Sequence, residues 1–344
     1  MRHEDILRKA IEAFRENTSI NIFPKSPPNP PPETQKNLIS DTIIEIKWQN
    51  QTFKYYVDIK STFNRPMLGL LINKYEKKKQ KVILIAQYIN PNLAEDLKKQ
   101  NIPFMDIAGN AFINDPPLLI FITGKKPEAQ IQPHAAYPAL NPSELQVIYI
   151  LLCLPGIENR PYREIAEKAK VALGSVGLTM NKLQKTGFLI DHPTQKRRLI
   201  RKKELLDRWV VEYPQRLRPK LLLNRYRSDQ KDWWEELDIT KFNACWGGDV
   251  AAYFLTRHLR PHTLTVYTDR LNNEFVMKNK LIKDVQGNIE ILEAFWNYPG
   301  LFRKKDLAHP VLVYSDLLAQ ADSRAVETAR MIYEKEIVQL IRED

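Results

Sequence analysis

Residues 161–190, PYREIAEKAKVALGSVGLTMNKLQKTGFLI, contain the pattern that decides the fold of the middle of the chain. The segment 161–170 predicts a short helix, and 173–186 predicts a second helix that ends at Gly187, a residue type that often follows helices. The sequence FLI at 188–190 then predicts a short strand, and RLI at 198–200 predicts its partner.

A further helix is predicted before this stretch, over 141–154, where Asn141 or Ser143 can cap it. Three helices followed by a two-stranded ribbon is the order of elements in a winged helix-turn-helix. In that fold the second helix supports the third, and the third enters the major groove of DNA. We therefore expect a winged helix-turn-helix DNA-binding domain over 141–204. The apolar residues of its first helix are Leu145, Val147, Ile148, Ile150, Leu151 and Leu154.

The helix predicted over 173–186 has two different sides. Spacings of three and four residues direct Leu173, Val176, Met180 and Leu183 inward. The outer side is expected to contact base edges and phosphates, and Asn is suited to paired hydrogen bonds with adenine. Ser175 and Lys182 are the leading candidates for groove contacts. The residues assigned to the outer side are Ser175, Thr179, Asn181, Lys182 and Lys185.

The positive charge of the chain is concentrated in this same region. The chain has 52 Lys and Arg against 41 Asp and Glu, a net charge of +11. Residues 155–227 hold 18 basic and 7 acidic residues, whereas the rest of the chain holds 34 of each and is neutral. A charge excess confined to one module is the electrostatic pattern of a nucleic-acid binder. The alternative is a solvated basic face that binds nothing.

The predicted ribbon supplies many of these charges. Six cations lie within eight residues at its tip and just after it, where they could contact phosphates on either side of the groove. The alternative is a three-helix packing domain with a basic loop. The six cations are Lys196, Arg197, Arg198, Arg201, Lys202 and Lys203.

Residues 1–124 predict a separate α/β module, because strand patterns alternate with helix patterns. The proline-rich stretch 21–33, NIFPKSPPNPPPE, predicts a connector rather than a helix or strand, and 125–140 predicts a linker. The expected helices are 4–16, 65–79 and 90–100, and the expected strands are 42–48, 52–60, 81–88, 104–106 and 118–123.

A short motif in this module, Asp58-Ile59-Lys60, matches the (D/E)-x-K pattern of restriction-type nucleases. Such a site needs two carboxylates for a divalent metal and a Lys near the attacked phosphate. A two-residue turn at 49–50 would bring Asp41 beside Asp58, whereas a three-residue turn at 49–51 would place it on the opposite face. The motif is short, so a metal-dependent nuclease, a degenerate nuclease-like scaffold and an exposed strand edge all remain open. Glu12 and Asp106 are further acids that could join such a site.

Residues 205–344 predict a third, α/β domain that begins with a helix-rich stretch including RYRSDQKDWWEEL. Trp246-Gly247-Gly248, a following helix and a strand over 264–268 match the order of elements in nucleotidyltransferases, whose acids on that strand hold metal. Thr265 and Tyr267 occupy the positions of those acids, so we expect no catalysis there. The alternative is a Gly-Gly helix entry packed under aromatic neighbours.

Several classes of protein are excluded or disfavoured by composition. Two cysteines rule out a disulfide scaffold and a Cys-rich zinc site. No apolar run approaches the roughly 18 residues that a membrane span needs, and the first residues lack the apolar region of a signal peptide. His258 and His262 have no acid cluster beside them and are expected to be surface or packing residues. We therefore expect a cytoplasmic protein without a metal, a cofactor or membrane contact.

Three stretches together resemble the AbiEi family of antitoxins from bacterial abortive-infection (type IV toxin–antitoxin) systems. The first is FMDIAGNAFI at 104–113, and the second is the helix-turn-helix at 142–190. The third is WGGDVAAYFLTRHLRPHTLTVYTD at 246–269, with VLVYSDLLAQADSRAVETARMIYEKEI at 311–337. The resemblance covers most of the chain. Many family members lack an α/β module in front, so the family does not define the role of residues 1–124.

The resemblance implies a transcriptional repressor and phage-defence antitoxin without catalytic residues. Family members bind double-stranded DNA at their own promoter through the winged helix. They also oppose a nucleotidyltransferase-like toxin encoded beside them, without a stable complex. Two other functions compete with this one: a metal-dependent nuclease that uses Asp58 and Lys60, and an interaction scaffold whose DNA contact is incidental.

Overall fold

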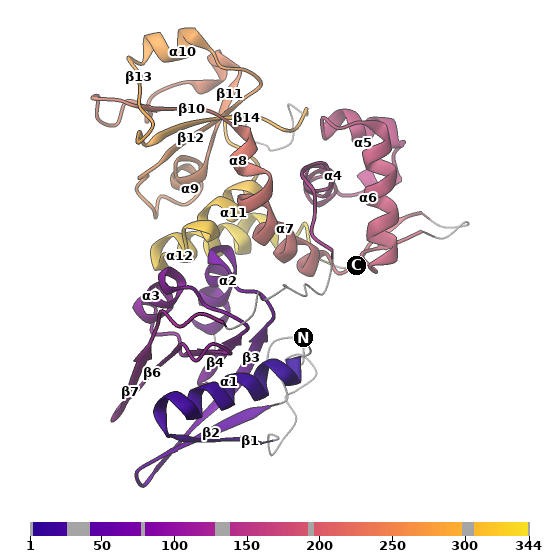
Figure 1. Ribbon diagram of the computed structural model, residues 1–344. Coiled ribbons are helices and arrows are strands. Elements are labelled where there is room, and N and C mark those ends of the chain that lie inside the picture. Colours follow the sequence, from indigo (N-terminus) through magenta and orange to yellow (C-terminus); the bar gives the residue numbers. More distant parts are fainter. Residues whose placement is uncertain are drawn as a thin grey trace. The chain divides into compact units, whose positions relative to one another are not determined.

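The computed structural model describes residues 3–25, 42–76, 80–127, 138–191, 196–297 and 306–342. The chain divides into two compact units, Met1–Pro138 and Ala139–Asp344. Both units combine helices with a β-sheet (Figure 1), so the predicted mixed α/β multidomain fold is confirmed.

The first unit is built on a seven-stranded sheet whose strands are neighbours in chain order. Strands β3, β4 and β5 run parallel, and the other neighbours run antiparallel. Each parallel connection contains a helix, as such crossovers usually do. The strands are β1 Asn21–Lys25, β2 Ile43–Trp48, β3 Gln51–Lys60, β4 Val82–Ala86, β5 Phe104–Asp106, β6 Ala111–Asp115 and β7 Leu118–Ile122, and the crossover helices are α2 Arg65–Glu76 and α3 Pro91–Lys99.

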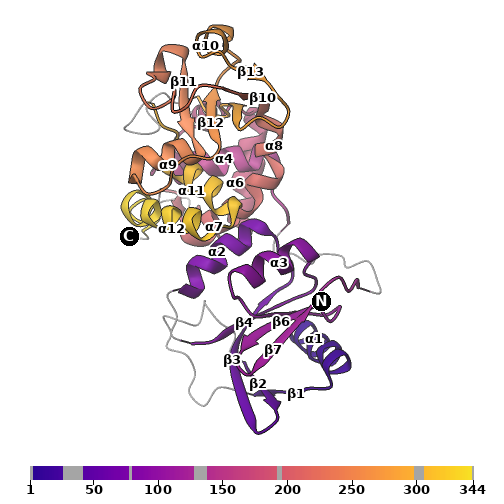
Figure 2. The same ribbon diagram turned by 90° about the vertical axis from the view of Figure 1, so that its left-hand side faces the viewer.

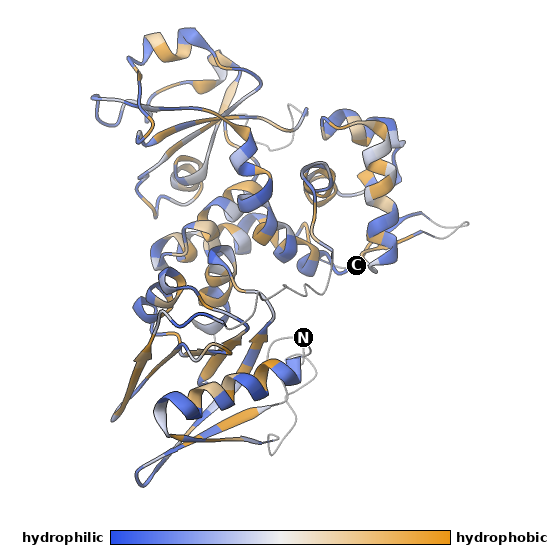
Figure 3. Cartoon of the chain, in the orientation of Figure 1, coloured by the Kyte–Doolittle hydropathy of each residue, from blue (hydrophilic) through white to orange (hydrophobic). Residues whose placement is uncertain are grey.

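Helix α1, His3–Thr18, covers one face of this sheet, and Figure 2 shows α2 and α3 on the other side. The apolar stripe of α1 is at most 4% exposed and packs against β2–β6. It consists of Ile6, Ala10, Ile11 and Phe14. In Figure 3 the strands of this unit carry both hydrophobic and hydrophilic segments, and β4, with the sequence VILIA, is hydrophobic throughout. Because each large apolar side chain in this layer contributes roughly 1.5–3 kcal/mol on burial, the α1 stripe holds the first unit together.

A turn after β5 is fixed by the carboxylate of Asp106, which is completely buried. Its Oδ1 accepts hydrogen bonds from the backbone N–H groups of Ala108 and Asn110, both at 2.9 Å. Its Oδ2 accepts from the backbone N–H of Ile89 at 2.9 Å and the side chain of Asn110 at 2.8 Å. Three of these contacts lie within the turn, and the fourth joins it to the loop after β4. These partners do not fit the expectation that Asp106 could join a metal site.

Two strands differ from the sequence prediction: β6 was not predicted, and β1 falls in a stretch that was wrongly predicted to be a connector. Strand β6 lies within residues 107–117 and forms a hairpin with β7. Strand β1 includes Pro24 of the proline-rich stretch, and β1 is an edge strand, where a residue without an N–H is tolerated. The remainder of that stretch lies outside the described residues.

The second unit begins with three helices and a two-stranded ribbon, in the predicted order. The three helices contact one another in every pairing. In the ribbon, Leu189 pairs with Leu199 and Ile190 pairs with Arg198. The elements are α4 Pro142–Cys153, η2 Ile157–Asn159, α5 Tyr162–Lys168, α6 Leu173–Lys185, β8 Leu189–Ile190 and β9 Arg198–Leu199.

A five-stranded sheet follows, with the order β11-β12-β14-β10-β13 and one parallel pair, β12 and β14. Helix α11 contacts α7, α9 and α12 beside it. The strands are β10 Leu222–Arg227, β11 Ala244–Gly247, β12 Leu264–Thr268, β13 Ile282–Lys283 and β14 Ile289–Glu293. The helices are α7 Lys202–Arg216, α8 Arg218–Leu221, η3 Ile239–Phe242, α9 Gly248–Thr256, α10 Asn273–Lys278, α11 Pro310–Gln320, α12 Ser323–Ile332 and η4 Tyr333–Ile337.

The prediction that the segment after residue 205 is rich in helices was right for α7 and α8, but residues 222–227 form the strand β10. Strand β10 pairs with β14 on one side and β13 on the other. These partners lie some 60 residues further along the chain, so local sequence gives no sign of them. Tertiary pairing therefore overrides the local preference of this segment.

Helix α7 joins the three helices to the five-stranded sheet. The Trp209 ring stacks on Tyr149 of α4 at 5.4 Å and on Tyr213 at 4.6 Å between centroids. Tyr149 also contacts Phe295, just after β14, at 4.8 Å. The Trp209 indole N–H donates to the Leu145 carbonyl at 2.8 Å. The boundary expected between residues 204 and 205 therefore falls inside one compact unit.

Within the described ranges, none of the helices combines the length and the apolar character that crossing a membrane would need.

Helix α11 begins at a buried histidine. The Nδ1 atom of His309 accepts a hydrogen bond from the Val311 backbone N–H at 3.2 Å, which caps the helix, and lies 3.2 Å from the Cys153 sulfur. Burial lowers the pKa of His309 to about 3. The folded unit therefore holds this ring neutral.

This histidine predicts a pH-dependent stability. Its folded pKa lies below the unfolded value of about 6.5, so the unfolded state binds the proton first as pH falls. The free energy of unfolding should therefore fall between about pH 6.5 and pH 3, with a limiting slope of about 1.4 kcal/mol per pH unit. Urea denaturation at several pH values measures this slope. His309→Asn keeps a favourable cap and should flatten it.

The exposed His262 provides the matched control, because His262→Asn should leave the slope unchanged. A slope that is the same in His309→Asn and the unaltered protein would contradict this assignment.

Candidate nucleic-acid interface

The inner side of α6 is packed against its neighbours. Val176, Met180 and Leu183 are at most 2% exposed, as predicted. Thr179 is also buried, and its hydroxyl donates to the Ser175 carbonyl at 2.7 Å. The expectation that Thr179 points outward was wrong, because residue 179 lies on the same helical stripe as 176 and 183.

The two ends of α6 also differ from expectation. Leu173 is 51% exposed rather than inward-facing, since it is the first residue of the helix and precedes the packed turns. Asn181 and Lys185 are exposed, and Ser175 is half-buried. The outer side of α6 therefore retains three of the predicted contact residues.

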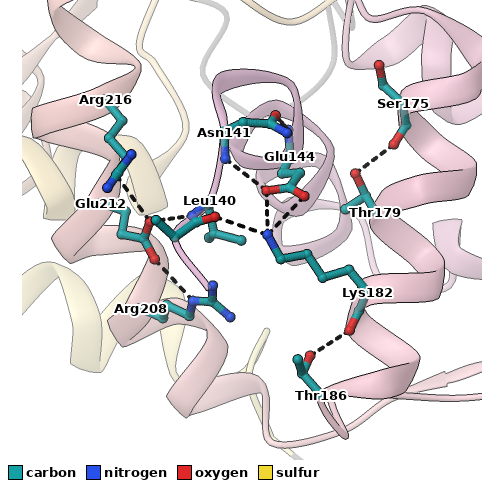
Figure 4. Close-up of polar contacts among 11 residues, drawn as sticks. Leu140, Asn141, Glu144, Ser175, Thr179, Lys182, Thr186, Arg208, Glu212 and Arg216 are labelled. Carbon is teal, nitrogen blue, oxygen red and sulfur yellow. Dashed lines mark hydrogen bonds and ion pairs between the residues drawn. The ribbon is translucent and has the colours of Figure 1, made fainter. Parts of the chain in front are cut away.

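Lys182 is turned toward α4 instead of toward solvent. Its Nζ donates to both carboxylate oxygens of Glu144, at 2.8 and 3.0 Å, and to the Ala139 carbonyl at 3.0 Å (Figure 4). The side chain is 22% exposed. Lys182 therefore fixes α6 against the start of α4, and the prediction that it leads the groove contacts does not fit these partners.

The residues before α4 are held from two sides. Asn141 caps α4 and forms a reciprocal capping box with Glu144, as the predicted cap requires. The backbone N–H of Leu140 donates to Glu212 of α7 at 2.6 Å, and Glu212 also binds Arg208 and Arg216 (Figure 4). Residues 139–141 thus connect α6, α4 and α7 through hydrogen bonds between their backbone and charged side chains. A prediction from hydrophobic periodicity does not include such contacts.

The ribbon is fastened by Arg197. Its guanidinium donates to Asp191 at 3.1 Å and to the Glu158 carbonyl at 3.2 Å, and lies 4.8 Å from the Tyr162 ring centroid. Lys196 and Arg198, on either side of it, are exposed. Arg197 therefore positions the ribbon against η2 and α5, while its two neighbours face solvent. Residues 192–195 lie outside the described ranges.

The three cations after the ribbon all have protein partners. Arg201 donates to Glu204 at 2.6 Å and lies over the Phe188 ring. Lys202 donates to the Arg342 carbonyl at 3.1 Å, and Lys203 pairs with Asp207. All three cations are therefore bound to carboxylates or a carbonyl of the protein, which favours structural roles at the start of α7.

Between residues 155 and 200, five exposed cations have no hydrogen-bond or ion-pair partner among the described residues, and we call them the open cations. Three of them, Lys185, Lys196 and Arg198, were predicted as DNA contacts. The other two were not predicted, because they lie at and just before the second helix rather than on the third helix or the ribbon. The open cations are Arg160, Arg163, Lys185, Lys196 and Arg198.

The nuclease motif of the first unit is ion-paired. The hairpin register pairs Trp48 with Gln51, so the two-residue turn is correct, but Asp41 lies outside the described residues. Lys60 and Lys74 bind opposite oxygens of Asp58, at 2.9 and 2.7 Å. Burial by itself raises the pKa of the Asp58 carboxyl, but the two ammonium groups outweigh it and lower the pKa.

Glu12, the other acid considered, forms an exposed ion pair with Arg8 on α1. The part of the chain that the structure describes has no group of three or more His, Cys, Asp or Glu side chains able to hold a metal ion.

The Gly-Gly helix entry is a packing feature. A Cβ atom at Gly247 would lie 2.4 Å from the Tyr267 ring, and one at Gly248 would lie 2.8 Å from the Thr265 hydroxyl. Thr265 and Tyr267 are both buried, and the Tyr267 hydroxyl donates to Asp316 at 3.2 Å. Thr265 and Tyr267 therefore fill the space over the two glycines, as the alternative of a packed Gly-Gly helix entry requires.

The fold thus defines a mixed α/β protein with a helical, cation-bearing surface next to a ribbon. Residues 198–338 match the family described as "Transcriptional regulator, AbiEi antitoxin, Type IV TA system", which bears out the predicted resemblance for the stretches 246–269 and 311–337. The other two stretches, 104–113 and 142–190, lie outside the match. No curated protein and no solved structure matches the chain.

The open cations predict how DNA affinity depends on salt. Lys185→Ala, Lys196→Ala and Arg198→Ala should each reduce the slope of log affinity against log salt by about 1, because each removes one phosphate contact. Fluorescence anisotropy titrations across a range of salt measure this slope. The control is Lys203→Ala, whose ammonium is paired with Asp207 and which should leave the slope unchanged. The assignment fails if all four variants behave alike.

For Lys182 we expect the opposite: its replacement should change the stability of the protein and not the salt dependence of DNA binding. Lys182→Met should lower the free energy of unfolding by about 1–2 kcal/mol, because the carboxylate of Glu144 loses a partly buried partner. The salt slope of DNA binding should stay unchanged. A variant of unaltered stability whose slope falls by about 1 would instead make Lys182 a phosphate contact.

Proposed function

We propose that this protein is a DNA-binding transcriptional repressor and antitoxin that binds the promoter of its own operon. The α4–α6 helices and the β8–β9 ribbon act as a winged helix-turn-helix, with α6 in the major groove. The observation that carries this proposal is the division of charge: α5, α6 and the ribbon keep the open cations exposed, while neighbouring basic residues are paired. The family match over residues 198–338 supports a regulator and antitoxin role.

The residues of the interface have distinct roles in this proposal. Ser175 and Asn181 face the groove from α6, and Lys185 contacts a phosphate from the last residue of that helix. Lys196 and Arg198 contact phosphates from the ribbon. Arg163 does so from α5, and Arg160 from the turn just before it. Lys182, Arg197 and Arg201 hold these elements in place.

The antitoxin role follows the resemblance. The protein opposes a nucleotidyltransferase-like toxin encoded beside it in a phage-defence operon, without a stable complex, and acts in the cytoplasm. The role is not enzymatic. The Asp58 carboxylate is engaged by two ammonium groups, and Thr265 and Tyr267 replace the acids of a nucleotidyltransferase. These contacts disfavour both catalytic alternatives.

Promoter binding is tested with the DNA segment immediately upstream of the gene. The full chain should bind this duplex about 10³-fold or more tighter than an unrelated duplex at physiological salt, and should repress a reporter placed behind it. A triple alanine variant of Lys185, Lys196 and Arg198 should lose both properties.

The control removes equal charge elsewhere, by alanine at the exposed Lys231, Lys241 and Lys278, and should retain both properties. Equal affinity for the upstream and unrelated duplexes, with no repression, would refute the proposal.

A further inference from the structure

An apolar side chain stands in the middle of the outer side of α6. Leu178 is 72% exposed, although Val176 and Met180, two residues away on either side, are fully packed. Figure 3 shows hydrophobic and hydrophilic residues alternating along this helix. Leu178 shares its face with Gly174 and Asn181, which lie four residues before it and three after it.

The surface next to Leu178 is open. A Cβ atom built on Gly174 would meet no atom within 4 Å. Helical side chains lean toward the N-terminus of their helix, so the Leu178 side chain extends over this bare glycine. In a helix-turn-helix the N-terminal part of the recognition helix contacts base edges. The segment of α6 best placed for bases therefore presents methyl groups.

The chemistry of the major groove limits what such a surface can read. The apolar group that the bases expose there is the C5 methyl of thymine, and Asn pairs with N6 and N7 of adenine. Leu178 and Asn181 are about 4.5 Å apart along the helix axis. Successive bases of one strand are about 3.4 Å apart, so the two side chains can reach the same base pair or adjacent ones.

The charges around this face favour DNA as its occupant. Lys185 follows Leu178 by seven residues on the same side of α6, and Arg198 is exposed on the ribbon beside Ile190, itself 49% exposed. Open cations next to exposed apolar side chains suit a ligand with a phosphate backbone and methyl-bearing bases.

We propose that Leu178 contacts a thymine methyl and Asn181 the adenine edge of an A·T-containing step in the major groove. This inference rests on the proposed function and adds the determinants of sequence specificity. It predicts that the protein discriminates thymine from uracil, which differ only in this methyl group.

The probe is the upstream duplex, prepared with thymine or with deoxyuridine in its place. The unaltered protein should bind the deoxyuridine duplex about fourfold more weakly for each contacted methyl, the change expected for burying one methyl group. Leu178→Ala should bind the thymine duplex more weakly and should no longer distinguish the two duplexes. Asn181→Ala should likewise lose sensitivity to 7-deazaadenine, which lacks N7.

The matched control is Met277→Ala on α10, because Met277 is 77% exposed and lies outside the proposed interface. It should keep the affinity and the discrimination of the unaltered protein. Circular dichroism should be unchanged in Leu178→Ala, since an exposed side chain adds little to folding.

Equal affinity of the unaltered protein for both duplexes would overturn the inference, and so would a deoxyuridine penalty that persists in Leu178→Ala. In both cases specific binding remains and the proposed function stands. Failure to bind the upstream duplex in either form would refute the proposed function and this inference together.

Discussion

The stacked rings of Tyr149, Trp209 and Tyr213 are the interaction on which the second unit depends. They join α4, which supports α6, to α7, which packs beside the five-stranded sheet. The stack continues into polar contacts, because the Tyr213 hydroxyl lies 2.8 Å from that of Tyr267 and Tyr267 donates to Asp316. The orientation of α6 is therefore set by the same core in which the Tyr267 ring packs over Gly247.

The basic stretch divides into cations that stabilise the protein and cations that remain available. The first group donates hydrogen bonds to neighbouring carboxylates and carbonyls, and so holds α6 and the elements beside it in place. Its members are Lys182, Arg197 and Arg201. The open cations remain exposed on α5, α6 and the ribbon. Net charge alone treats both groups equally, although only the second group can release counterions from DNA. This division explains how a module with a large positive charge can present a defined surface.

Much of the fold could be predicted from local sequence. The order of α4, α5, α6 and the ribbon followed from apolar spacing and from Gly187, and Asn141 was one of the two caps expected for α4. Strand β10 could not be predicted, because its partners lie far along the chain. At the site, periodicity identified the inner side of α6 but misplaced Thr179 and Leu173, and did not assign Leu178. The pairing of Lys182 with Glu144 depends on how two helices pack, so no local pattern contains it.

The central claim is that α6 and the β8–β9 ribbon together form the DNA-contacting surface. Hydrogen–deuterium exchange of the full chain, with and without the upstream duplex, tests it most directly. The account predicts slower exchange of backbone amides within residues 173–190 and 196–199 when DNA is bound, with the buried strands β12 and β14 unchanged. Protection confined to other segments, with α6 and the ribbon exchanging as in the free protein, would contradict it.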